Sequence, residues 1–150
     1  MRIIRAGVND LDLIAPLFDK YRTFYKQSSN ITVGRNFLRE RLNNNESIIF
    51  LAVEEQDSEL KALGFTQLYP SFSSVSMKRL WILNDLYVDQ TARRKGVGGK
   101  LLDKAKELAI ETDAKGLTLQ TDIDNYSAQH LYESNEYIKD VECYHYNLTF

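Results

Sequence analysis

A glycine-rich, basic turn joins a β-type segment to the most regular helical segment of the chain. The turn contains Gly96, Gly98 and Gly99, and glycines allow a backbone to pass close to a ligand with its N–H groups turned inward. The first turn of the helix that follows adds unpaired N–H donors and a partial positive charge. Cations complete a site suited to a pyrophosphate: Arg93, Arg94, Lys95 and Lys100. The alternative is a solvated basic turn whose glycines only reverse the chain.

Two other phosphate-binding motifs do not fit this turn. A P-loop requires Ser or Thr after its lysine, but Leu101 follows Lys100. The dinucleotide fingerprint requires a third Gly or Ala, and that position is again occupied by Leu101. Both motifs are therefore rejected.

The spacing of apolar residues predicts a mixed α/β order around the turn. Apolar residues recur every three or four positions in the helical segments, and they alternate or run together in the β segments. Helices are expected near residues 9–25, 33–42, 98–111 and 127–133, and strands near 3–4, 47–54, 62–69, 79–88, 117–121 and, once or twice, within 137–150. This order indicates an α/β fold with a central sheet.

Local patterns predict how some of these helices begin and which faces they bury. Asn9 is expected to be the N-cap of the first helix, and Pro16 is expected to kink or delay that helix. Val33 is expected on the apolar side of the second helix, with Phe37, Leu38 and Leu42. The third helix should bury one face, made of Val97, Leu101, Leu102, Ala105, Leu108 and Ala109.

Composition limits the class of protein. The length of 150 residues suits a single domain, residues 1–150. The 19 basic residues are outnumbered by 21 acidic ones, which argues against a nucleic-acid partner. One cysteine and two histidines argue against a disulfide or a metal site, and Cys143 is expected to be a buried small hydrophobe. The longest apolar run, residues 48–53, is too short for a membrane span, so a soluble cytoplasmic domain is expected.

Two motifs in order along the chain resemble those of the GNAT N-acetyltransferases. The first is Arg93-x-x-Gly96-x-Gly98 after a β-type segment, and it resembles the acetyl-CoA motif of that family. The second, Asn125-x-x-Ala128-x-x-Leu131-Tyr132-Glu133, resembles the family's Asn…Leu-Tyr-Glu helix. The resemblance implies a GNAT fold across residues 1–150: a mostly antiparallel mixed sheet of six to seven strands, splayed at the acetyl-CoA site and flanked by about four helices.

The resemblance also implies which residues hold acetyl-CoA. Free backbone groups of Leu86, Tyr87 and Val88 would bind the pantetheine arm, and Asn125 would contact the CoA chain. The turn would wrap the pyrophosphate, mostly through main-chain N–H groups, with Arg93, Arg94, Lys95, Gly96, Val97, Gly98, Gly99 and Lys100. Tyr132 would lie beside the thioester sulfur and protonate the leaving thiolate as general acid. No metal is implied.

A candidate for the general base lies in the strand expected before the turn. Residues 83–88 resemble a strand of the diamine acetyltransferases, which carry Glu-Asp where Asn84-Asp85 stand here. Asn84 cannot accept a proton, so Asp85 is the next candidate, as a base acting through water or as an anionic anchor for a cationic amine. The structural alternative is a carboxylate that caps a turn or pairs with a cation. The acceptor site is expected to include Tyr25, Asn84, Asp85 and His145.

A departure from the family pattern follows the last predicted helix. The family often has Gly where Glu136 stands, in a left-handed conformation that is costly for Glu. Asn135 tolerates that conformation better, so the helix cap is expected one residue earlier.

The leading hypothesis is an acetyl-CoA-dependent transfer of an acetyl group to a primary amine, by direct attack of the amine on the thioester. The acceptor classes are a polyamine, an amino acid or small basic metabolite, and a protein lysine or N-terminus. The alternative is a CoA-binding sensor or scaffold without catalysis, and a nucleic-acid binder is disfavoured. The alternating tail at Tyr144, Tyr146, Leu148 and Phe150 favours a homodimer through a C-terminal strand, although a monomer's edge strand would alternate in the same way.

Overall fold

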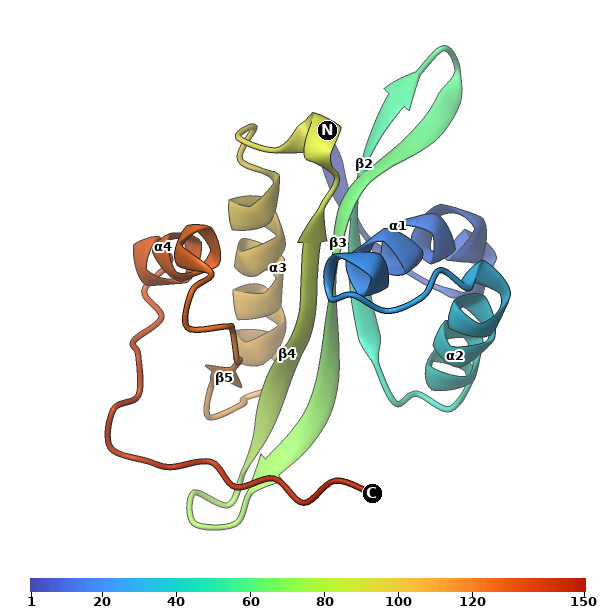
Figure 1. Ribbon diagram of the computed structural model, residues 1–150. Coiled ribbons are helices and arrows are strands. Elements are labelled where there is room, and N and C mark those ends of the chain that lie inside the picture. Colours follow the sequence, from blue (N-terminus) through green and yellow to red (C-terminus); the bar gives the residue numbers. More distant parts are fainter. The chain divides into compact units, whose positions relative to one another are not determined.

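The structure is a computed structural model that describes residues 1–150, and its contacts divide the chain into two compact units, Met1–Gln120 and Thr121–Phe150 (Figure 1). The first unit contains β1 (Arg2–Ala6), α1 (Leu11–Phe24), α2 (Ile31–Asn43), β2 (Ile48–Gln56), β3 (Glu59–Ser73), β4 (Lys78–Val88), α3 (Val97–Glu111) and β5 (Leu117–Thr118), with short 3-10 turns η1 (Val8–Asp10) and η2 (Gln90–Ala92). The second unit contains α4 (Tyr126–Ser134). The mixed α/β class is confirmed.

The first unit is built on a five-stranded sheet in the order β1-β2-β3-β4-β5. The first four strands are antiparallel, and β5 runs parallel to β4. The β4–β5 pairing covers only Trp81↔Leu117 and Ile82↔Thr118. From Leu83 onward, the outer edge of β4 therefore has no strand partner, and its backbone groups on that side are open to another partner.

Helices cover both faces of this sheet (Figure 1). α1 and α2 share one core cluster with the sheet, centred on Leu11, Ile14, Leu38, Leu51 and Phe65. α3 packs against β2, β3 and β4, and its predicted buried face is confirmed at all six positions: Val97, Leu101, Leu102, Ala105, Leu108 and Ala109. No helix is long and apolar enough to cross a bilayer.

The start of α1 differs from the prediction. The turn η1 takes up Asn9, so the N-cap of α1 is Asp10, whose carboxylate accepts a hydrogen bond from the Gly7 N–H at 2.8 Å. Pro16 lies inside α1 without delaying it, because the residues on both sides belong to a face that is buried in the core. In α2, Val33 is 58% exposed, and the buried positions are Gly34 and Leu38.

The second unit corrects the predicted strand count. Residues 137–150 form no strand, so the sheet has five strands instead of six to seven. A strand needs a hydrogen-bonded neighbour, and the tail has none in the sheet. Its alternating apolar side chains are exposed, and Cys143 is exposed instead of buried. Asn135 is the C-cap of α4, with φ −106°, but the left-handed residue is Glu136, with φ 71°, so the left-handed conformation does not move to Asn135 as predicted.

Candidate functional site

A β-bulge in β4 sets the direction of the central side chains. Gln67 is paired with Asp85 while Leu68 is paired with Leu83, so Asn84 is an extra residue in β4. An extra residue reverses the alternation of side chains along a strand. Before the bulge, Trp81 turns toward α3, where its Nε1 donates to Thr112 Oγ1 at 2.8 Å. After the bulge, Tyr87 turns toward α1, with its ring 6.4 Å from that of Tyr21.

The bulge buries the carboxylate of Asp85, which is 3% exposed. Gln67 Nε2 donates to Asp85 Oδ2 at 2.5 Å and Asn84 Nδ2 donates to Oδ1 at 3.0 Å. Burial raises the pKa of the Asp85 carboxyl, against the opposing effect of hydrogen bonds from Gln67, Tyr21 and Asn84. Asp85 is thus a carboxyl with increased proton affinity, and no cation pairs with it.

An aromatic row on the α1 side leads from Asp85 to the surface. The Tyr21 ring lies 5.9 Å from that of Phe65 and 5.1 Å from that of Tyr25. Tyr25 is the C-cap of α1 and is 41% exposed. Of the predicted acceptor residues, the structure therefore brings Tyr25, Asn84 and Asp85 to one region, linked by Tyr21.

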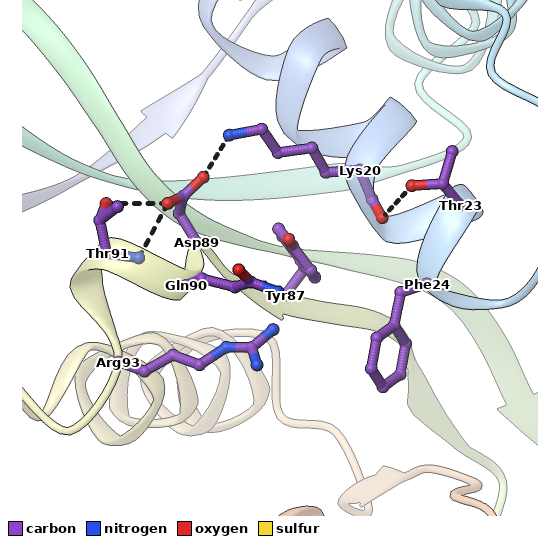
Figure 2. A pocket seen from close by; sticks show the side chains of 8 residues that line it. All are labelled: Lys20, Thr23, Phe24, Tyr87, Asp89, Gln90, Thr91 and Arg93. Atoms are coloured by element: carbon purple, nitrogen blue, oxygen red, sulfur yellow. Dashed lines mark hydrogen bonds and ion pairs between the residues drawn. The ribbon is translucent and has the colours of Figure 1, made fainter.

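A pocket of about 460 Å³ lies between α1 and the end of β4 (Figure 2). We call it the β4–α1 pocket. Its lining comes from α1, from the end of β4 and from the η2 turn: Lys20, Thr23, Phe24, Tyr87, Asp89, Gln90, Thr91 and Arg93. The volume is within the range of small-molecule sites.

An ion pair between Lys20 and Asp89 closes one side of the β4–α1 pocket. Asp89 also accepts hydrogen bonds from the Thr91 N–H at 3.0 Å and from Thr91 Oγ1 at 2.8 Å. The hydrogen bond from Lys20 is the main reason why the pKa of Asp89 falls to about 2, and the same contact raises the pKa of Lys20. The pair ties α1 to the start of the basic turn.

Arg93 occupies the backbone edge at the end of β4. Its Nε donates to the Val88 carbonyl oxygen at 3.1 Å, and its guanidinium lies 5.8 Å from the centre of the Tyr87 ring (Figure 2). This carbonyl belongs to the stretch of β4 whose outer edge, opposite β3, has no strand partner. The other cations of the turn, Arg94, Lys95 and Lys100, are exposed.

Gly96 is the N-cap of α3 and has φ 74° and ψ 11°, a left-handed conformation that favours glycine. No side chain caps α3, so the first N–H groups of the helix are available to an anion. A Cβ at Gly96 or Gly99 would meet no atom within 4 Å, so the space over the turn is open. The turn therefore has the geometry of an anion site at a helix N-terminus.

Three predicted site residues belong to the second unit. Asn125 is the N-cap of α4, and its side chain accepts a hydrogen bond from the Ala128 N–H at 3.2 Å. Tyr132 lies in α4, with its ring 5.8 Å from that of Tyr137. His145 lies in the tail and is exposed. The first unit contains the other predicted residues: Tyr25, Asn84, Asp85, residues 86–88 and residues 93–100.

Sequence reasoning missed Lys20, Tyr21 and Gln67 as parts of this region. Gln67 carried a usable signal, because it is a polar residue in the middle of an apolar strand. Lys20 carried none, since a cation on a surface helix is ordinary. No group of three or more His, Cys, Asp or Glu side chains is arranged to hold a metal ion.

The model of the acetyltransferase (GNAT) family matches residues 14–137 of the chain. A Bacillus subtilis protein named an uncharacterized N-acetyltransferase is 51% identical over 149 residues, covering 99% of this chain and 97% of that protein. A probable acetyltransferase of Haemophilus influenzae is 33% identical over 127 residues, covering 85% of each chain. The crystal structure of a probable acetyltransferase superposes with a TM-score of 0.92 at 49% identity and covers 100% of this chain and 98% of the other.

Proposed function

The chain belongs to the acetyltransferase (GNAT) family and is an acyltransferase, and on this premise we propose that it moves an acetyl group from acetyl-CoA to a primary amine by direct attack on the thioester. The observation that carries the proposal is the arrangement at the end of β4. There an unpaired backbone edge runs from a buried carboxylate, Asp85, to the glycine-capped start of α3.

The residues of the first unit fit acetyl-CoA. The unpaired edge at residues 86–88 offers backbone groups to the amides of the pantetheine arm. The open turn at residues 93–100 offers N–H groups and cations to the pyrophosphate. In this proposal, Arg93 leaves the Val88 carbonyl when the pantetheine arm binds, and Asn125 contacts the CoA chain. Acetyl-CoA supplies the thioester carbonyl, and a main-chain N–H near Val88 polarises it.

Asp85 is proposed to accept the proton of the acceptor amine or to bind the amine in its protonated form. A primary amine with a pKa near 10 is mostly protonated at pH 7, and its deprotonation costs about 4 kcal/mol at roughly 1.4 kcal/mol per pH unit. Burial makes Asp85 a stronger base than an exposed aspartate, and Gln67 and Asn84 hold its orientation. It acts through a water molecule or as the anion that anchors the cationic amine. Tyr25, Asn84 and His145 complete the proposed acceptor site.

Tyr132 is proposed as the general acid that protonates the CoA thiolate, with Tyr126 as its matched control. Tyr126→Phe removes the hydroxyl of an exposed tyrosine on the same helix. Tyr132→Phe should lower kcat by about 10²–10⁴ with little change in CoA affinity, whereas Tyr126→Phe should leave both unchanged. Full activity of Tyr132→Phe would show that the acid is another group.

The function as a whole is tested by thiol release from acetyl-CoA against polyamines, amino acids and basic peptides. We expect turnover with one of these classes, which would identify the acceptor. No thiol release with any acceptor, together with acetyl-CoA binding in calorimetry, would favour the non-catalytic sensor. No thiol release and no acetyl-CoA binding would contradict the acetyl-CoA site at the turn.

A homodimer is also part of the proposal. The tail carries apolar side chains at alternate positions, and those side chains are exposed in the single chain. A second copy would give this tail a strand partner.

A further inference from the structure

A second pocket, of about 110 Å³, lies at the other end of the sheet from the basic turn. Its lining comes from four strands and the loop before β2: Arg5, Asn45, Ser47, Ile48, Pro70, Arg79 and Trp81. We call it the two-arginine pocket. Trp81 also bonds Thr112 at the C-terminal end of α3, so the pocket is on the α3 side of the sheet, far from the N-terminus of that helix.

All charged side chains that line the two-arginine pocket are cationic. They are Arg5 on β1 and Arg79 on β4, and neither forms an ion pair with a carboxylate. The guanidinium of Arg79 lies 5.2 Å from the centre of the Phe72 ring and 5.3 Å from that of Trp81. Two unneutralised guanidinium groups are thus held at one small cavity, in a chain whose net charge is −2.

Ser47 adds a buried hydroxyl without a hydrogen-bond partner to the lining of the two-arginine pocket. It is 7% exposed, and its Oγ is buried without a hydrogen-bond partner. A buried hydroxyl in that state lowers stability unless a ligand or water satisfies it. The Trp81 indole N–H is already bonded to Thr112, so the remaining donors of the pocket are Ser47, Asn45 and the two arginines.

We propose that the two-arginine pocket binds a small oxyanion, a phosphate or a carboxylate group. Both oxyanions present acceptor oxygens, which match a set of guanidinium, amide and hydroxyl donors. The volume is larger than the roughly 10–15 Å³ that one water molecule needs, and below the roughly 300 Å³ where drug-sized sites begin. A single anionic group of a few atoms therefore fits, whether free or at the end of a larger ligand.

The fluorescence of Trp81 gives a direct readout, because it is the only tryptophan of the chain and it lines the pocket. The full chain is titrated with inorganic phosphate and, separately, with acetate, each against sodium chloride at equal ionic strength. We expect a saturable change with at least one of the two anions. A response to phosphate alone assigns a phosphate site, and a response to acetate alone assigns a carboxylate site.

The contribution of Arg5 to anion binding is tested by Arg5→Gln, with Arg2→Gln as the control. Arg2 is an exposed arginine on the same strand that does not line the pocket, so both variants lose one positive charge from β1. The half-saturation concentration should rise about tenfold or more in Arg5→Gln and stay unchanged in Arg2→Gln. Circular dichroism of both variants verifies that the fold is retained.

Ser47→Ala separates binding from stability. The substitution removes an unsatisfied buried hydroxyl, so the Tm without anion should be equal to that of the wild type or higher. Anion affinity should fall at the same time. A wild-type chain with no saturable response to either anion would overturn the proposal. So would a response that Arg5→Gln leaves unchanged, since it would place the anion elsewhere, for example at the basic turn.

Discussion

The buried carboxyl of Asp85 affects stability as well as the proton transfer proposed for it. Burial raises its folded-state pKa above the ordinary 3.8, so the folded protein binds this proton more tightly than the unfolded chain does. Its contribution to the free energy of unfolding is therefore fully present below about pH 3.8 and is lost as the pH rises through the folded pKa.

Asp85→Asn should make the protein more stable and less active at neutral pH. The amide keeps the shape of the side chain without a buried charge, so the stability gain over the wild type should be large at pH 7 and vanish near pH 3. Urea unfolding across that pH range measures the difference. If Asp85 is the base as proposed, its loss should lower kcat/KM by about 10²–10⁴. A stability difference that does not vary with pH would mean that folding does not raise the pKa of Asp85.

Asp89 should show the opposite pH dependence. Lys20 holds its pKa at about 2 in the folded state, below the ordinary 3.8. The stability from this pair is present above about pH 3.8 and is lost as the pH falls toward 2. Asp89→Asn should therefore be less stable than the wild type at neutral pH, with the difference closing below pH 3.8 in urea titrations. A difference of constant size down to pH 2 would assign the loss to the Thr91 contacts instead.

At the scale of elements, the pairing of β3 with β4 depends on a close backbone approach at Gly64. A Cβ added there would lie 2.7 Å from the Tyr87 carbonyl oxygen and 3.2 Å from the Val88 Cα, so the strands would have to move apart. Gly64→Ala should reduce the free energy of unfolding by about 1–3 kcal/mol. The proposed acetyl-CoA site uses this part of β4, so the KM for acetyl-CoA should also rise.

Gly116 provides the matched control for Gly64, because a Cβ at Gly116 meets no atom within 4 Å. Gly116→Ala should leave both the urea midpoint and the KM near their wild-type values. Equal effects of the two substitutions would point to the unfolded chain, where any Gly→Ala change acts, and away from the strand contact.

An element could be predicted from the sequence where its own residues determine its structure. α3 shows every third or fourth residue apolar, and its buried face follows from that spacing alone. The bulge at Asn84 could not be predicted, because it is defined by the register of β3, a strand distant along the chain. The hydrogen bonds to the Asp85 carboxylate depend on that bulge and on Tyr21. The sequence therefore predicted the carboxylate but not the side chains that donate to it. The predicted start of α1 was wrong because Asn9, although a residue type that caps helices, belongs to the 3-10 turn η1 before the helix.

At the scale of the whole molecule, the C-terminal tail, residues 137–150, differs from the structure that its sequence pattern predicts. Residues 144–150 alternate between apolar and polar side chains, which is typical of a half-buried strand. In the single chain, Tyr144, Tyr146, Leu148 and Phe150 are at least 83% exposed and form no strand. A period of two needs both a hydrogen-bonded neighbour and a surface to cover the apolar face. The pattern could predict the apolar face of the tail but not whether a second chain covers it.

The proposed homodimer predicts that the tail decides the oligomeric state. Light scattering after gel filtration should give a mass of twice 17.4 kDa for the wild type. Leu148→Glu places a charge on the apolar face of the tail and should shift the mass to one chain, whereas Thr149→Glu places the same charge on the opposite face and should not. Because both variants add one carboxylate at neighbouring positions, net charge cannot explain a difference between them. A monomeric wild type, or two variants with the same mass, would show that the tail does not join two copies.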